Sequence, residues 1–269
     1  MHVIVTRPAR QADDWLAALQ AEGHSTNHVP LIEITPASRP QDQAAHALAL
    51  QSLSGCRALM FVSGNAVEHF FMTNQPIAPI EQQQYAIKLI VNHPSHLRCW
   101  ATGPGTVQAL LAAGVPPAMI DAPAHDGGQF DSEALWQIVQ SQVKLGGRML
   151  IVRGRDVDMP DSSRDWLAQQ IAAQGGQASS LVVYERRAPA LSASQIAQSQ
   201  AWLRDGSVWL WSSSQALRHL PPQLDVSQGT CICTHERIAQ AAKNQGFAVV
   251  CTSRPTVHDV LASIKSLHD

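Results

Sequence analysis

An internal repeat runs through the 269 residues of this chain and limits the folds that it can adopt. Residues 2–30 and 148–184 each contain an apolar strand pattern, then a helical pattern, then a second strand pattern. In each copy the first strand pattern ends near an arginine, and the helical pattern carries Asp-Trp-Leu-Ala, at 14–17 and again at 165–168. The shared order and spacing indicate a repeated structural unit.

The repeat continues with two further strand-to-helix junctions in each half of the chain. Residues 59–70 resemble residues 208–220, because a buried strand pattern meets a helical pattern at small hydroxyl residues in both. Residues 99–106 correspond in the same way to residues 231–234. Strands that alternate with helices predict an α/β fold with mostly parallel sheets. Each half offers about four or five strands, enough for one small doubly wound sheet.

Two proline-marked segments interrupt the repeat at the same point of each copy. Residues 29–36 and 182–189 are extended patterns closed by a proline, which is typical of a strand-like linker. Two such linkers would let the chain leave a first domain, build a second and return. Residues 74–97 have no counterpart in the other half, and we interpret them as an insertion or a long loop.

The composition excludes several classes of function. With 19 Lys and Arg against 21 Asp and Glu, the chain carries a formal charge of -2, whereas general nucleic-acid or membrane-surface binders carry a basic excess. No apolar run approaches the ~18 residues of a membrane span, and the sequence starts directly with an apolar strand pattern. We therefore expect a cytoplasmic protein that binds neither nucleic acid nor membrane. No apolar seam demands a dimer, so we expect a monomer.

The five cysteines are an odd number without a Cys-x-x-Cys pair, which in a chain of this length indicates reduced thiols. Cys231 and Cys233 alternate in a short strand pattern and would share one face of that strand. They could be two small packing residues or a redox pair, and packing is the commoner use of such residues.

Small polar residues stand at four junctions where a strand pattern meets a helical pattern. In an open parallel sheet, ligands bind at the carboxyl ends of the strands, where free N–H groups of helix N-termini attract anions. Each junction contributes about 0.3–1 kcal/mol, so only several together could hold a polyanion. The alternative is plain N-capping, because Ser, Thr and Asn are preferred there anyway. The candidate residues are Ser63 and Asn65, Gly103 and Thr106, Ser212 and Ser213, and Thr234.

Several common motifs of cofactor and metal sites are missing from the sequence. The segment Thr-Gly-Pro-Gly-Thr at 102–106 lacks the spacing and the lysine of a P-loop, and no Gly-x-Gly-x-x-Gly follows the first strand pattern. We therefore expect no dinucleotide cofactor. His93 and His96 form a His-x-x-His pair, but no carboxylate or cysteine completes a ligand set, so we expect no metal.

Three arginines lie where strand patterns end: Arg7 in the first copy of the repeat and Arg153 and Arg155 in the second. A guanidinium group binds a carboxylate through two parallel hydrogen bonds, so these side chains could hold an acidic ligand. The alternative is an ion pair within the protein, with Asp13 or Asp14 for the first arginine and Asp156 or Asp158 for the others.

Tyr184 is one of only two tyrosines, and it lies in the second predicted linker. There it would face the gap between the two domains, where its hydroxyl could donate or accept a proton. The alternative is a packing role, which is the commoner use of a tyrosine in such a segment.

Short motifs follow one another over nearly the whole chain: Val-Thr-Arg-Pro at 5–8, Phe-Val-Ser-Gly-Asn-Ala-Val at 61–67, Thr-Gly-Pro-Gly-Thr at 102–106, Ile-Val-Arg-Gly at 151–154, Val-Tyr-Glu-Arg at 183–186 and Thr-His-Glu-Arg-Ile-Ala at 234–239. Each is weak alone, but the ordered set resembles the uroporphyrinogen-III synthase family of the tetrapyrrole pathway. Residues 74–97 match this family least.

The resemblance implies a fold of two flavodoxin-like parallel-sheet α/β domains, joined by a two-stranded linker, with the first domain discontinuous. In this numbering the first domain comprises residues 1–36 and 188–269 and the second comprises residues 40–182, with linkers at about 30–40 and 182–189. This division replaces a simple cut between the two halves of the sequence.

The resemblance also implies a cofactor-independent lyase that cyclises hydroxymethylbilane to uroporphyrinogen III, inverting the last pyrrole ring and releasing water. Tyr184 matches the tyrosine suggested as the family's proton donor to the leaving hydroxyl. The carboxylates of this tetrapyrrole would be bound by the four junctions and by Arg7 and Arg153. A non-catalytic two-domain sensor of a small polyanion is the alternative from another class of protein.

Overall fold

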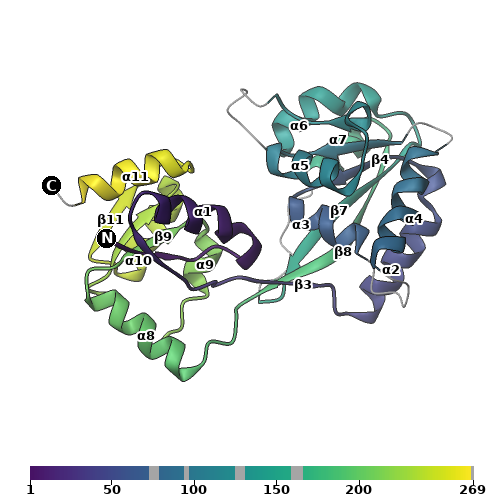
Figure 1. Cartoon of the computed structure of the whole chain (residues 1–269). Helices are drawn as coiled ribbons and strands as arrows, with labels where there is room; N and C mark the ends of the chain where they lie inside the picture. The colour runs from purple at the N-terminus through teal and green to yellow at the C-terminus, as the bar shows by residue number, and fades with distance from the viewer. Residues whose placement is uncertain (73–78, 94–96, 125–130, 159–165, 268–269) are drawn as a thin grey trace. The chain divides into compact units, whose positions relative to one another are not determined.

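A computed structural model of the chain describes residues 1–72, 79–93, 97–124, 131–158 and 166–267. The chain forms two compact units, Met1–Glu33 with Arg187–Asp269 (unit 1) and Ile34–Arg186 (unit 2), both drawn in Figure 1. It passes from one unit to the other at 33–34 and again at 186–187. Unit 1 is therefore discontinuous in sequence, whereas unit 2 is continuous.

Unit 1 is built on a sheet with the strand order β11-β10-β9-β1-β2, in which neighbouring strands run parallel. Numbered along the chain within the unit, this is the order 2-1-3-4-5 of flavodoxin-like folds. The strands are β1 (His2–Val5), β2 (Ser25–His28), β9 (Val208–Trp211), β10 (Thr230–Cys233) and β11 (Val249–Thr252). The helices are α1 (Ala9–Ala21), α8 (Ala193–Arg204), α9 (Ser214–Arg218), α10 (Glu236–Gln245) and α11 (Val257–Ser266).

The central strand of unit 1, β9, is apolar throughout because both faces of its sheet are buried. On one face Val5 and Leu210 pack in a core to which α1 and α11 contribute. Successive side chains of a strand point to opposite faces, so Trp209 and Trp211 lie on the other face. Their rings stack with centroids 5.9 Å apart.

Unit 2 is built on a sheet with the order β3-β8-β7-β4-β5-β6, and its pairs from β8 to β6 are parallel. The strands are β3 (Glu33–Pro36), β4 (Cys56–Phe61), β5 (Arg98–Ala101), β6 (Ile120–Asp121), β7 (Arg148–Asp156) and β8 (Gln177–Arg187). The α-helices are α2 (Pro40–Gln51), α3 (Gly64–Phe71), α4 (Pro79–Val91), α5 (Pro104–Ala113), α6 (Ser132–Val139) and α7 (Trp166–Ala173). Short 3-10 turns are η1 (Leu53–Gly55), η2 (Pro117–Met119) and η3 (Gln140–Gln142).

Strand β4 shows how the sequence places helices on both faces of the second sheet. Leu59 and Phe61 belong to a core that includes residues of α3, α4 and α5. Ala58 and Met60, which alternate with them, belong to a separate core with α6 and α7. The alternation follows from the period of two residues in a strand.

Apart from the extra strand β3 of unit 2, the strands of the two sheets have the same spatial order, but the chain begins each sheet at a different strand of that order. The β1–α1–β2 segment of unit 1 takes the place that β7–α7–β8 takes in unit 2, and β9, β10 and β11 correspond to β4, β5 and β6. Each half of the sequence therefore contributes to both units.

Strands β3 and β8 are neighbours at one edge of the sheet of unit 2, and the chain enters unit 2 at β3 and leaves it at the end of β8. The predicted fold class is confirmed.

Of the two interpretations of residues 74–97, the long loop is wrong for the described part, which forms α4 (Pro79–Val91). An insertion agrees with the structure, because only α9 lies between the corresponding strands β9 and β10. Ala86 and Ile90 of α4 are buried in the core shared with α3 and α5. They are four residues apart and therefore lie on one helix face. The three glutamines at 82–84 precede them and hide the apolar period in the sequence. The flanking residues 73–78 and 94–96 lie outside the described residues.

The described cysteines are free thiols, as expected. Cys231 and Cys233 lie on one face of β10, fully buried, with their Sγ atoms 3.9 Å apart. Burial raises the pKa of Cys99 to about 12, so this thiol stays protonated near neutral pH.

Candidate functional site

The carboxyl ends of the strands in unit 2 bring several predicted site residues onto one rim. In the sheet register, Phe61 of β4 pairs with Ala101 of β5 and with Val152 of β7, and Val152 pairs with Leu181 of β8. Parallel strands end at the same edge of a sheet, which is where ligands bind in this class of fold. The predicted residues just beyond these positions are Ser63, Gly103, Arg153 and Tyr184.

Ser63 is the N-cap of α3, and its Oγ accepts a hydrogen bond from the N–H of Ala66 at 3.2 Å. The first turn of a helix has N–H groups without acceptors inside the helix. Gly64 and Asn65 occupy this turn, so their N–H groups and the positive end of the helix dipole face the rim. The N-capping alternative and an anion site are therefore compatible at this junction.

Gly103 is the N-cap of α5, and no side chain caps this helix. Its first residue, Pro104, has no N–H group. The N–H of Thr106 donates to the Gly103 carbonyl at 3.0 Å, so it is not available to a ligand. Thr106 itself is buried in the first turn. This junction consequently offers an anion fewer donors than the start of α3 does.

Tyr184 lies on β8 and is only 1% exposed, whereas the prediction placed it in an exposed linker. The reason is that β8 is an internal strand, between β3 and β7, and not an exposed linker. The Tyr184 hydroxyl oxygen lies 3.2 Å from the Oγ of Ser63, and either group can be the donor. Its ring stacks on the imidazole of His69 from α3, with centroids 5.7 Å apart and planes at 23°.

The pairing of Ser63 with Tyr184 suits a proton donor. The Ser63 oxygen can accept from Ala66 and at the same time donate its own hydrogen to the Tyr184 oxygen. In that arrangement the phenol keeps its hydrogen for another acceptor. A Ser63 hydroxyl that donates in this way would also stabilise a phenolate at position 184.

Arg153 and Arg155 of β7 have different surroundings. Arg153 is half-buried, and its Nε donates to the Gly154 carbonyl at 3.4 Å. Arg155 is buried, and its Nη2 lies 2.5 Å from Glu185 Oε1 and 2.7 Å from Asp42 Oδ2. Arg155 is therefore held within the protein by two carboxylates.

Glu185 is the centre of a buried polar network beside Tyr184. Burial alone would raise the pKa of this carboxyl, but hydrogen bonds from Arg155 and Ser38 outweigh burial and hold the pKa below its usual value. The Oγ of Ser38 donates to Glu185 Oε2 at 2.9 Å. Nearby, Asp156 Oδ1 lies 2.5 Å from the Nε of Arg186. The network ties β7, β8 and the segment after β3 to one another.

Arg7 follows β1 on the rim of unit 1 and contacts an aromatic ring. Its Cζ lies 4.4 Å from the centre of the Trp15 ring. Within the described residues, neither Asp13 nor Asp14 pairs with it, and its Nε is buried without a hydrogen-bond partner. Burial lowers the pKa of Arg7, but a guanidinium stays charged near neutral pH. Arg7 is therefore a charged guanidinium at a strand end, and its Nε has no hydrogen-bond partner among the described residues.

Ser212 and Ser213 follow β9, the central strand of the first sheet. Ser213 is the N-cap of α9, and its Oγ accepts from the N–H of Gln215 at 3.1 Å. Ser212 precedes it and is half-buried. The repeat thus places Ser213 in unit 1 where it places Ser63 in unit 2.

Thr234 follows β10 and is buried. Its N–H donates to the Trp211 carbonyl at 2.9 Å, so this N–H is not open to a ligand. The N-cap of α10 is the next residue, His235, whose Nδ1 accepts from the N–H of Arg237 at 3.0 Å. Only the side chain of Thr234 remains as a candidate contact.

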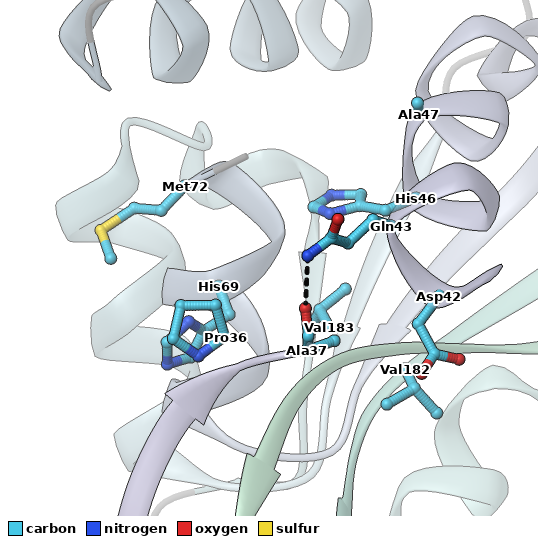
Figure 2. A pocket seen from close by; sticks show the side chains of 10 residues that line it. All are labelled: Pro36, Ala37, Asp42, Gln43, His46, Ala47, His69, Met72, Val182 and Val183. Carbon is cyan, nitrogen blue, oxygen red and sulfur yellow. Dashed lines mark hydrogen bonds between the residues drawn. The ribbon is translucent and has the colours of Figure 1, made fainter. Parts of the chain in front are cut away.

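A cavity of about 170 Å³ in unit 2 was not indicated by any sequence motif (Figure 2). Gln43 and His46 of α2 line it; Gln43 Nε2 donates to the Ala37 carbonyl at 3.1 Å. His46 Nε2 donates to the Phe70 carbonyl at 2.9 Å. Burial lowers the pKa of His46, and this hydrogen bond opposes the effect only in part. The cavity is thus lined by a histidine that favours its neutral form.

His69 links this cavity to the candidate proton donor, because it lines the cavity and stacks on Tyr184. The sequence held one signal for it: the repeat aligns His69 with His219. In unit 1, however, His219 Nδ1 donates to the Leu31 carbonyl at 2.7 Å, and both tyrosines of the chain belong to unit 2. The two histidines therefore have different local roles.

The residues that the structure describes hold no group of three or more His, Cys, Asp or Glu side chains arranged for a metal ion. His93 is buried and its Nε2 donates to the Leu53 carbonyl at 2.8 Å. Its partner in the His-x-x-His motif, His96, lies outside the described residues.

Comparison with known proteins gives one consistent family. A family model described as "Uroporphyrinogen-III synthase HemD" matches residues 13–262. A curated relative, the uroporphyrinogen-III synthase of Chlorobaculum parvum, is 28% identical over 197 residues, which are 72% of this chain and 67% of the relative.

Two solved structures show the same fold at 15% sequence identity. The uroporphyrinogen-III synthetase of Helicobacter pylori aligns over 99% of each chain with a TM-score of 0.59. A mutant uroporphyrinogen III synthase of Thermus thermophilus aligns over 99% of this chain and 98% of its own with a TM-score of 0.55.

Proposed function

This chain belongs to the uroporphyrinogen-III synthase family, and we propose that Tyr184 is the proton donor of its reaction. The reaction of this family is the closure of the linear tetrapyrrole hydroxymethylbilane to uroporphyrinogen III, with inversion of the last pyrrole ring and loss of water. The chain is accordingly a cyclising lyase of haem biosynthesis. The observation that carries the role of Tyr184 is its hydrogen bond to Ser63 at the start of α3.

In the proposed mechanism, the Tyr184 hydroxyl gives its proton to the hydroxyl of the terminal ring, which leaves as water. The azafulvene cation that forms on this ring is attacked by the substituted carbon of the ring at the other end of the chain, and that carbon becomes the centre of a spiro intermediate. This intermediate fragments and closes again with the last ring inverted. The ring carbon that forms the final bond loses a proton, which returns to the Tyr184 oxygen, so that the enzyme ends as it began.

Tyr184 is buried, so the substrate has to approach its hydroxyl from the side of Ser63, which is half-buried. The N–H groups of the first turn of α3 lie at the same place and would hold a carboxylate there. The enzyme's main task is to hold a flexible chain with its two ends together, which is catalysis by positioning.

The residues proposed to bind the substrate's carboxylates come from both units. Arg7 is the strongest single candidate, because its guanidinium is charged and has a buried Nε without a partner among the described residues. An arginine can bind a carboxylate through two hydrogen bonds. The other proposed contacts are Ser63, Asn65, Gly103, Thr106, Arg153, Ser212, Ser213 and Thr234.

We propose that the protein acts as a cytoplasmic monomer without a cofactor, and that it binds no nucleic acid. The formal charge of -2 supports the last point. No helix among the described residues is long and apolar enough to span a bilayer.

The test of the proposed function is to supply hydroxymethylbilane and to separate the product isomers. Hydroxymethylbilane closes spontaneously to the type I isomer without inversion. The proposal predicts that the type III isomer forms in excess and in proportion to the amount of enzyme. Formation of the type I isomer alone would contradict it and would favour a non-catalytic binder of polyanions.

A further inference from the structure

The ring of Tyr184 occupies the space that a side chain at position 154 would need. Gly154 of β7 pairs with Tyr184 of β8 in the sheet register. A Cβ atom added to Gly154 would lie 2.2 Å from Cζ of Tyr184 and 2.4 Å and 2.6 Å from its two Cε atoms. Real Cβ atoms do not approach other atoms so closely. Gly154 has no left-handed backbone angle, so space alone requires a glycine here.

His69 is the second neighbour of the Tyr184 ring. It is 7% exposed and comes from the last turn of α3. The centroid distance of 5.7 Å and the interplanar angle of 23° describe a stacked pair. This separation lies within the range in which aromatic rings attract each other.

Helix α3 thus supplies two contacts to the Tyr184 side chain. Ser63 caps the start of α3 and binds the Tyr184 hydroxyl, while His69 near the end of the same helix stacks on the ring. A rigid helix keeps these two contacts at a constant separation. Gly154 adds the close approach of β7, so that two elements, α3 and β7, define the place of the ring.

The repeat shows that a histidine at this position is not sufficient for such an arrangement. His219, the counterpart of His69, donates to the backbone carbonyl of Leu31 at 2.7 Å. Its role is to join α9 to the segment after β2, and neither tyrosine of the chain belongs to its unit. The stacked arrangement with a tyrosine is therefore specific to unit 2.

We propose that His69 and Gly154 are positioning residues that keep the Tyr184 hydroxyl against Ser63, and that His69 acts through its flat ring rather than through its protons. This inference rests on the proposed role of Tyr184 as proton donor. It predicts that a phenylalanine can replace His69, whereas an aliphatic residue of similar size cannot.

The test uses the fact that the chain has only two tyrosines. In a Tyr85→Phe background, labelling tyrosine with carbon-13 at Cζ gives a single NMR signal, that of Tyr184. His69→Leu should shift or broaden this signal and lower kcat by up to roughly tenfold, with KM within about twofold. His69→Phe should restore both the signal and kcat. His219→Leu is the matched control and should leave the Tyr184 signal in place.

The inference about His69 fails if His69→Leu changes neither the signal nor kcat. It also fails if His69→Phe is folded but no better than His69→Leu, because a proton of the imidazole would then be required. The NMR arm is independent of activity. If no type III isomer is formed by the parent enzyme, the proposed function fails while the signal still decides whether His69 holds the ring.

Gly154→Ala tests the other residue. It should shift the Tyr184 signal and lower the melting temperature, because the ring has to move away from the new methyl group. In a Tyr184→Ala background the same substitution should have little effect on the melting temperature, since the obstructing ring is gone. An equal decrease in both backgrounds would overturn the role of Gly154.

Discussion

The hydroxyl groups of Ser63 and Tyr184 lie 3.2 Å apart, although 121 positions separate the two residues in the sequence. Ser63 starts α3, which follows the strand β4, whereas Tyr184 lies on β8. Strand β7 pairs with both strands and brings them to the same edge of the sheet. The pair therefore exists only when the whole sheet of unit 2 has formed.

Removing the Ser63 hydroxyl should affect both stability and catalysis. Ser63→Ala removes the cap of α3 and should cost about 0.5–2 kcal/mol of unfolding free energy. It also removes the hydrogen bond to Tyr184, so kcat should fall. Ser192→Ala is a matched control, because Ser192 caps α8 through its side chain and is exposed.

Urea unfolding and steady-state kinetics of both variants check this prediction. The control should lose a similar amount of stability and keep the kcat of the parent enzyme. Equal kcat values for Ser63→Ala and the parent would show that the Ser63 hydroxyl has no catalytic role.

The buried carboxyl of Glu185 should make the stability of the protein depend on pH. Its pKa is held below the usual value by Arg155 and Ser38, so the unfolded state binds its proton more readily. The contribution to stability is complete above the unfolded pKa of about 4.3 and is lost as the pH falls through the lower folded pKa.

Glu185→Gln should leave Arg155 without part of its charge compensation and cost about 3–5 kcal/mol near neutral pH. The decrease in stability between about pH 6 and about pH 3 should also be smaller in this variant, because the carboxyl whose pKa is lower in the folded state is gone. Urea unfolding over this range is the measurement. Glu133→Gln on the exposed start of α6 is the control. If the stability lost between about pH 6 and about pH 3 were as large in Glu185→Gln as in this control, the prediction would be contradicted.

Arg7 should contribute to substrate binding more than to turnover. Arg7→Met removes a charged group that can make two hydrogen bonds to a carboxylate, so KM should rise roughly tenfold while kcat changes little. Arg204→Met is the control, since Arg204 is exposed in the same unit and its ion pair with Asp225 is long, at 3.9 Å. Steady-state kinetics of both variants decide the question. An unchanged KM for Arg7→Met would remove Arg7 from the proposed site.

The order of the strands predicts how fragments of the chain behave. Residues 34–186 contain the strands β4 to β8 without interruption and should fold alone. Residues 187–269 lack β1, which lies between β9 and β2 in their sheet, and should not fold until a peptide of residues 1–33 is added. Circular dichroism and cooperative thermal unfolding of the fragments give the answer. Cooperative unfolding of 187–269 alone would contradict it.

The sequence repeat was sufficient to predict the two sheets and the caps of α3 and α9, because caps and strand patterns depend on neighbouring residues. Ser63 and Ser213 occupy the positions expected from it. Helix α4 was missed, since its buried face shows only in Ala86 and Ile90 after a run of glutamines.

The surroundings of Tyr184 could not be predicted, because they depend on contacts between residues far apart in the sequence. An isolated segment with a closing proline resembles an exposed linker, but here it continues an internal strand. The space that the ring needs is provided by Gly154, and the stacking partner by His69 on another element. The ion pairs of Arg155 with Asp42 and Glu185 were missed for the same reason, as only nearby aspartates were considered.

The most direct test of the central claim compares the two tyrosines of the chain. Tyr184→Phe removes the hydroxyl that is the proposed proton donor, together with its hydrogen bond to Ser63. Tyr85→Phe makes the same change at a residue of α4 that is 55% exposed. The measurement is kcat and KM for formation of the type III isomer from hydroxymethylbilane. We predict that kcat falls by roughly 100-fold or more in Tyr184→Phe, with a smaller change in KM, and that Tyr85→Phe matches the parent enzyme. An unchanged kcat in a folded Tyr184→Phe variant would contradict the role of Tyr184.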